Sequence, residues 1–209
     1  MNVTFEKTGA RRYSVYVERD RAPALWIWSA PGYDDYLPHD VLHFVAEAEF
    51  GLDGAVFGDL AAGGNAHIFI PVDKTLVAKM WRKQRTHRIR LPDGRRSELL
   101  AGVLEAAWKA RRGGRRLPED WHERLAAARV DEAKVEALLP SLDELAGRWH
   151  ALQPGGSMTL AWPRPERRRH PATRAARDKR GAPRASAGGA APPAARSEAP
   201  SRRGGAPGG

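Results

Sequence analysis

The sequence contains no cysteine among its 209 residues, and this absence excludes several kinds of chemistry. Disulfides, thiolate metal ligands and thiol nucleophiles are ruled out, which fits a reducing compartment. No run approaches the ~20 consecutive apolar residues that a membrane-spanning helix needs. The N-terminus carries charge at Glu6 and Lys7 and lacks the apolar core of a signal peptide. We therefore expect a soluble cytoplasmic protein without membrane contact.

Large apolar residues are missing from one end of the chain. Residues 164–209 contain no Leu, Ile, Val, Phe, Tyr, Trp or Met, and twelve Lys or Arg stand against three acids. Such a segment buries too little apolar surface to offset its ordering entropy, so a disordered basic tail rich in Arg, Ala, Pro and Gly is predicted. Residues 1–163 are predicted as a single domain. Its charge is segregated, at −5 over 1–78, +10 over 79–116 and −4 over 117–163.

Sequence motifs for several common activities are also absent. The chain has no G-x-x-x-x-G-K-S/T phosphate loop, no G-x-G-x-x-G after a strand and no G-x-S-x-G elbow. It has no helix-turn-helix, zinc-finger or aromatic RNA-binding signature either. Motifs therefore predict neither a nucleotide-binding fold, nor a serine hydrolase, nor a known nucleic-acid module.

Alternation of apolar and polar residues with a period of two predicts a small sheet. Three N-terminal runs show it, around Val3–Phe5, Tyr13–Val17 and Leu25–Trp28, with turn residues between them. A C-terminal run at 157–162 is expected to return to this sheet, and 67–72 is expected at an edge because it contains a proline. The predicted fold is α+β, a small antiparallel sheet of three N-terminal strands plus a C-terminal strand, packed on helices.

Besides a short helix that begins at 118–120, two longer helices are predicted in the second half of the body. One begins at Ser97, after a turn predicted at 92–94 from the Pro-Asp-Gly sequence. The other spans 135–152, where apolar residues recur every three or four positions. Pro140 predicts an interruption of that helix, and Ser141 has the capping-box spacing that would restart it.

A further helix, predicted between Pro38 and Gly51, carries the sharpest feature of the sequence. His39, His43 and Glu47 are four residues apart and therefore share one face. Two histidines at this spacing on a helix can bind one metal ion through their ring nitrogens. The sequence thus predicts a divalent-metal site, with zinc as an example, whose ligands are His39, His43 and Glu47.

The first five residues of this helix resemble the zincin motif H-E-x-x-H, with Asp40 where zincins carry the general base. Asp40 is a candidate general base, although its side chain is one methylene shorter than the glutamate of zincins. Alternatively, Asp40 could hydrogen-bond to a metal ligand without binding the metal itself. Glu47 lies ~12 Å along the helix axis from His39, so a third ligand could instead come from elsewhere. The candidates for such a tertiary contact are His67, Asp53, Asp59 and Glu49.

A structural interpretation of the same residues remains open. His39 could cap the first turn, His43 could be a core histidine bonded to Glu47 or to a strand, and Asp40 would favour the helix dipole. A His-Asp doublet also occurs in the phosphohydrolases of the HD superfamily, but these need further helical histidines, and none precedes His39. No reaction follows from these residues, and whether the protein is an enzyme is left open.

The alternative function is a non-enzymatic module that binds nucleic acid or another polyanion. Residues 79–116 contain thirteen Lys or Arg with Trp81, His87 and Trp108 among them, and 79–96 is predicted as a basic, mobile segment. The tail would add weak, salt-sensitive affinity that does not depend on sequence. The competing interpretation is a cationic arm folded over the acidic body, with a passive tail.

Several short patterns recur together in this chain: L-P-H-D-x-x-H-F-x-x-E at 37–47, F-G-L at 50–52, F-G at 57–58, R-W-H-A-L at 148–152 and P-G-G at 154–156. Together they resemble a group of small uncharacterised bacterial proteins, to which no activity is assigned. The resemblance covers roughly 1–62 and 130–163. It implies shared N-terminal strands, a histidine-bearing helix and a terminal helix–strand unit, and it implies no function.

Overall fold

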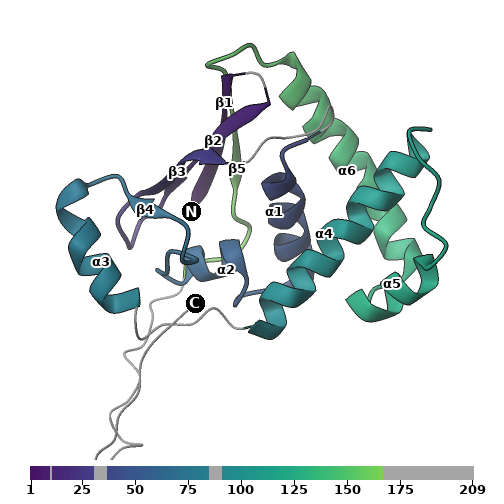
Figure 1. The fold of residues 1–209 in the computed structure, drawn as a ribbon, viewed down its shortest axis with the longest axis horizontal. Coiled ribbons are helices and arrows are strands. Elements are labelled where there is room, and N and C mark those ends of the chain that lie inside the picture. The colour runs from purple at the N-terminus through teal and green to yellow at the C-terminus, as the bar shows by residue number, and fades with distance from the viewer. Residues whose placement is uncertain (10, 31–36, 85–90, 167–209) are drawn as a thin grey trace, which may run out of the picture. The chain divides into compact units, whose positions relative to one another are not determined.

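The computed structural model describes residues 1–9, 11–30, 37–84 and 91–166. The predicted α+β fold is confirmed: the described residues form a five-stranded antiparallel sheet and six α-helices (Figure 1). The prediction of a disordered tail falls, from residue 167 onward, outside the described residues. The basic segment predicted to be mobile is 79–96, and its residues 85–90 also lie outside the described residues. No helix in the described ranges combines the length and apolarity needed to cross a membrane.

The sheet has the strand order β4-β3-β2-β1-β5. Its three N-terminal strands and its C-terminal strand lie where the alternating pattern predicts them, and β5 pairs with β1. The edge segment is also confirmed, although its strand has only two residues and ends at a proline. The strands are β1 (Asn2–Gly9), β2 (Arg12–Glu18), β3 (Leu25–Ala30), β4 (Ile70–Pro71) and β5 (Ser157–Ala161).

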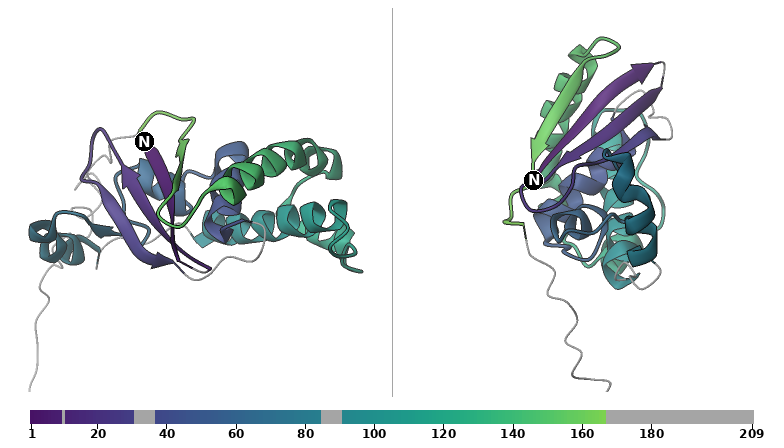
Figure 2. Two further views of the ribbon diagram at one scale, coloured as in Figure 1. Left: turned by 90° about the horizontal axis from the view of Figure 1, so that it is seen from above. Right: turned by 90° about the vertical axis from the view of Figure 1, so that its left-hand side faces the viewer.

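One face of the sheet is buried against helices and the other is exposed (Figure 2). Val3 lies opposite Val17 on one side and Leu160 on the other, and all three are buried. On the outer face, Tyr16 pairs with Trp26. The period-two pattern therefore separates the core from the surface, as expected for a sheet with one solvated face.

Helices cover the inner face of the sheet. Aromatic contacts join β1 to α2 through Phe5 and Phe57, and β2 to α6 through Tyr13 and Trp149. The central helix α1 packs against α2 and α4. The helices are α1 (His39–Phe50), α2 (Val56–Ala61), α3 (Val77–Gln84), α4 (Leu91–Arg111), α5 (Trp121–Ala128) and α6 (Glu132–Ala151), with a 3-10 turn, η1 (Lys74–Leu76).

The helix α1 begins and ends at the predicted signals. Pro38 precedes its first residue, and Gly51 closes it in the left-handed conformation, with φ of 69°. The backbone N–H of Gly51 donates to the carbonyl of Glu47, which satisfies one of the last carbonyls of the helix. Local chemistry at its two ends thus fixes the helix that carries the histidine pair.

The helix α4 begins six residues earlier than predicted, at Leu91, so the expected turn at 92–94 is wrong. Pro92 fits the first turn because its missing N–H would have no helical partner there. The Asp93 carboxylate accepts the backbone N–H of Gly54 at 2.9 Å and thereby ties the helix start to the loop after α1. The described parts of the predicted basic segment 79–96 belong to the helices α3 and α4.

The helix α6 is continuous, so the predicted interruption at Pro140 is wrong. Pro140 cannot donate the helical hydrogen bond to the carbonyl of Glu136, and both residues lie on the exposed side of the helix. The Ser141 hydroxyl does not cap a new helix. It donates to the carbonyl of Leu138 at 2.7 Å, within the same helical turn.

Two residues of the predicted tail, Arg164 and Glu166, contact the body. The Arg164 guanidinium donates to the carbonyls of Ala48 and Glu47, at the end of α1. The Glu166 carboxylate accepts the backbone N–H groups of Asp20 and Arg21. The described body therefore continues through residue 166 rather than stopping at 163.

Replacing Gly58 by alanine is expected to destabilise the fold by roughly 1–3 kcal/mol, because α2 packs directly on the loop before it. A Cβ at Gly58 would lie 2.2 Å from the carbonyl oxygen of Leu52, a backbone atom that cannot easily move. Gly147, in α6, is the matched control, since a Cβ there meets nothing within 4 Å. Alanine at Gly147 should stabilise by about 1 kcal/mol, so chemical denaturation should give opposite signs for the two variants.

Candidate metal centre

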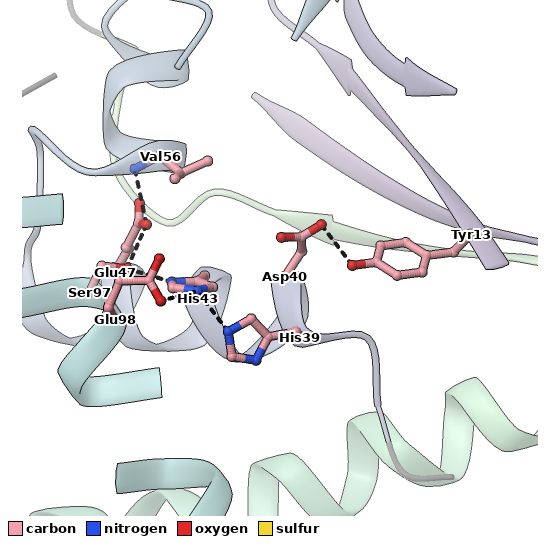
Figure 3. A network of polar contacts seen from close by, with 8 residues as sticks. All are labelled: Tyr13, His39, Asp40, His43, Glu47, Val56, Ser97 and Glu98. Atoms are coloured by element: carbon pink, nitrogen blue, oxygen red, sulfur yellow. Dashed lines mark hydrogen bonds and ion pairs between the residues drawn. The ribbon is translucent and has the colours of Figure 1, made fainter. Parts of the chain in front are cut away.

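Two helices bring three candidate ligand side chains together (Figure 3). His39 and His43 come from α1, and Glu98 comes from α4. One ring nitrogen of each histidine and one carboxylate oxygen all lie within 4.8 Å of one another. In the described part of the chain, this is the one group of three or more His, Asp and Glu side chains with such spacing. These three residues could hold a metal ion.

The spacing of the ligand atoms suits a four-coordinate ion. Nε2 of His43 lies 3.1 Å from Nε2 of His39 and 3.5 Å from Oε2 of Glu98. In a tetrahedral site with metal–ligand bonds of about 2.0–2.1 Å, neighbouring ligand atoms are about 3.3–3.4 Å apart. These two distances bracket this value, and the third, between the ligand atoms of His39 and Glu98, is at most 4.8 Å, so the adjustment needed to admit an ion falls on these two exposed side chains.

The centre is buried on one side and open on the other. His43 is 6% exposed, whereas the Glu98 side chain is 70% exposed and His39 is also exposed. Water can therefore reach the exposed ligands, while the buried imidazole is held by the packing of α1 against α4. A site with three protein ligands and access to solvent retains a position for water or another small ligand.

The inner nitrogen of His43 is occupied by a neighbour on α4. Nδ1 of His43 lies 2.8 Å from the hydroxyl of Ser97, so Nε2 is the nitrogen that faces His39 and Glu98. Burial lowers the pKa of His43, although the nearby Glu98 carboxylate acts in the opposite direction. The imidazole is therefore neutral at pH 7, which is the form that binds metals.

Glu47, the predicted third ligand, lies behind the histidine pair and is not part of the group of three. Its carboxylate accepts the backbone N–H groups of Val56, Phe57 and Gly58 at 3.1, 2.6 and 3.1 Å, and the hydroxyl of Ser97 at 2.9 Å. Burial raises the pKa of Glu47 to about 7 against the lowering effect of these hydrogen bonds. The carboxylate thus joins α1 to the start of α2.

Asp40 points away from the histidine pair toward the sheet (Figure 3). One of its carboxylate oxygens accepts the hydroxyl of Tyr13, on β2, at 2.8 Å. Burial, followed by the Asp40 charge, raises the pKa of Tyr13 well above its ordinary value, so the phenol stays protonated and donates. In this arrangement Asp40 ties α1 to the sheet, and it does not point toward the ligand atoms as a base would.

Glu98 is a site residue that sequence reasoning missed. No spacing rule connects it to the histidines, which lie more than fifty residues earlier, and only the packing of α1 on α4 brings it near them. The candidates proposed for a tertiary contact are not in the group. Three of them have other partners: Asp59 accepts the N–H of Ala66, Glu49 pairs with Lys134, and Asp53 pairs with Arg164.

The basic stretch 79–116 does not present its aromatic residues uniformly to solvent. Trp108 is 1% exposed and donates its indole N–H to Asp143, so it is not available to stack on bases. Lys109 is also buried and pairs with Glu105 at 2.7 Å. Arg82, on α3, is exposed, while His87 lies outside the described residues. Binding of nucleic acid or another polyanion stays a prediction.

Comparisons with protein-family models, with curated proteins and with solved structures give no match for this chain. The resemblance to small bacterial proteins therefore also stays a prediction. What can be said of function comes from the geometry of the site alone.

Proposed function

We propose that this protein binds one divalent metal ion, zinc being the expected one, through Nε2 of His39, Nε2 of His43 and a carboxylate oxygen of Glu98. The observation that carries the proposal is the convergence of these three atoms from two helices. Two imidazoles and a carboxylate are a common ligand set for zinc in proteins, and the chain has no thiolate that would compete.

The electrostatics of the metal-free centre support the same proposal. With the proton of His43 on Nδ1, its Nε2 is a lone pair that lies 3.5 Å from a carboxylate oxygen of Glu98. Two acceptors that face each other gain when a positive group lies between them. In the metal-free protein the Nε2–H of His39, 3.1 Å from Nε2 of His43, provides part of that charge. A metal ion would provide more, and His39 would bind it through Nε2 with its ring proton on Nδ1 instead.

The chemistry that a metal would supply is Lewis acidity at an open position. The chain's own residues hold the ion and keep one ligand, His43, out of water. Because Asp40 is turned toward Tyr13, it does not take the place of the zincin base in this arrangement. The proposal is therefore metal binding at a site that retains a position for water, and it includes no assigned reaction.

The test is a metal analysis of the full chain, purified without a histidine tag and without chelator. Wild type should contain close to one equivalent of zinc, or take up one on titration, and His43→Ala should retain less than a tenth. His150→Ala removes an exposed histidine from α6 and serves as the matched control, with unchanged stoichiometry. Equal metal content in wild type and His43→Ala, or none in wild type after titration, would refute the proposal.

A further inference from the structure

One buried hydroxyl lies between the metal centre and the carboxylate of Glu47. Oγ of Ser97 is 2.8 Å from Nδ1 of His43 and 2.9 Å from Oε1 of Glu47. All three side chains are buried, with exposed fractions of 1% for Ser97, 6% for His43 and 0% for Glu47. They come from α4 and α1, so this chain of contacts crosses the same helix pair that presents the metal ligands (Figure 3).

The direction of these two hydrogen bonds follows from the acceptors around Glu47. Both carboxylate oxygens also accept backbone N–H groups of α2, which can only donate. When the Glu47 carboxyl is ionised it can only accept, so the single hydroxyl proton of Ser97 is donated to it and the Ser97 oxygen is left as an acceptor toward His43. The ring proton of His43 must then be on Nδ1, and the lone pair must be on Nε2.

We infer that Ser97 is a positioning residue of the metal centre: its hydroxyl, oriented by Glu47, holds His43 with Nδ1–H inward and the Nε2 lone pair toward His39 and Glu98. This inference rests on the proposed function. Metal-binding histidines commonly donate their second ring N–H to a fixed acceptor, which sets both ring orientation and tautomer. Here the acceptor is the Ser97 hydroxyl, and this hydroxyl is in turn oriented by the Glu47 carboxylate.

The arrangement also connects the metal centre to α2. The carboxylate that orients Ser97 is itself held by the first backbone N–H groups of α2, the nearest being that of Phe57 at 2.6 Å. Movement of α2 would therefore change the acceptor that faces His43, without any contact between α2 and the ion. Ser97 and Glu47 act through His43, and neither is proposed as a ligand.

The first test reads the tautomer of His43 in the metal-free protein. Nitrogen-15 correlation spectra of the full chain, recorded with chelator and well above the Glu47 pKa of about 7 so that this carboxyl is ionised, should show Nδ1 protonated and Nε2 unprotonated. The His43 signals are assigned by their loss in His43→Gln. In Ser97→Ala the acceptor is gone, so the population with the proton on Nε2 should rise. A wild-type His43 protonated on Nε2, or an unchanged tautomer in Ser97→Ala, would overturn the inference.

The second test measures zinc affinity. Ser97→Ala should weaken binding about 10- to 100-fold, and Ser97→Thr, which keeps the hydroxyl, should recover most of the affinity. Ser141→Ala is the matched control, because Ser141 donates to a carbonyl of its own helix, and its affinity should equal that of wild type. Wild-type affinity in Ser97→Ala would refute the positioning role.

The two tests separate this inference from the proposed function. Absence of zinc binding in wild type would end the proposed function, while the tautomer spectra would still decide whether Ser97 and Glu47 fix His43. Melting temperatures of the serine variants identify any loss of affinity that comes from unfolding, and in that case the Ser97→Thr result decides. Failure of Ser97→Thr to bind better than Ser97→Ala would contradict the role of the hydroxyl.

Discussion

Replacing Glu47 by alanine is expected to lower the free energy of unfolding by roughly 3–5 kcal/mol. The carboxylate accepts hydrogen bonds from three backbone N–H groups at the start of α2 and from Ser97. Because Glu47 is fully buried, its removal leaves these donors without their acceptor and opens a cavity in the core. Chemical denaturation of the full chain at pH 7, with chelator present, would measure the change.

Glu49 provides the control on the same helix. Its carboxylate is 44% exposed and pairs with Lys134 at 3.3 Å, so Glu49→Ala should change the stability by less than about 1 kcal/mol. The comparison isolates burial and hydrogen bonding from the loss of one negative charge on α1. Losses of similar size in the two variants would contradict the structural role given to Glu47.

The helix that carries the histidines could be predicted because its signals are local. Pro38 and Gly51 mark its ends through backbone chemistry that involves only a few neighbouring residues. The four-residue spacing then places His39 and His43 on one face, and their ring nitrogens do meet at 3.1 Å. The sheet could be predicted for a similar reason, because the alternation of apolar and polar residues along each strand indicates which face of the sheet is buried.

The third member of the group could not be predicted, since it depends on how two helices pack. Glu98 lies on a helix whose start was misplaced, because the Pro-Asp-Gly sequence at 92–94 is typical of a turn. In the structure these residues form the first turn of α4, and Asp93 is anchored by a tertiary hydrogen bond to Gly54. Tertiary contacts of this kind override a local preference and leave no trace in residue spacing.

Glu47 illustrates another limit of the sequence pattern. The spacing correctly placed it on the histidine face, where a buried carboxylate needs partners. It did not indicate which partners would satisfy it, and four donors from α2 and α4 take that role. The four-residue spacing therefore predicted which face of the helix carries the polar groups. It did not predict which of them would be metal ligands, because that depends on their separation along the helix axis and on the neighbouring elements.

The stability of the chain is expected to depend on pH through Glu47, because burial raises its pKa to about 7 from an ordinary value of 4.5. Between these values the folded state binds more protons than the unfolded state, so the free energy of unfolding falls as the pH rises. The difference between the two pKa values corresponds to roughly 3 kcal/mol. This contribution is fully present below about pH 4.5 and is lost as the pH rises through about 7.

Glu47→Gln separates this effect from other titrating groups, since glutamine keeps the shape and does not ionise. Burial lowers the pKa of His43, so its contribution has the opposite sign and is lost as the pH falls below its ordinary 6.5. His43 is present in both proteins and largely cancels in their difference. With chelator present, the stability of wild type relative to Glu47→Gln should therefore fall by roughly 3 kcal/mol between about pH 4.5 and 8. A difference that is constant or rises with pH would show that the Glu47 carboxyl is not penalised by burial, and that its four hydrogen bonds outweigh desolvation.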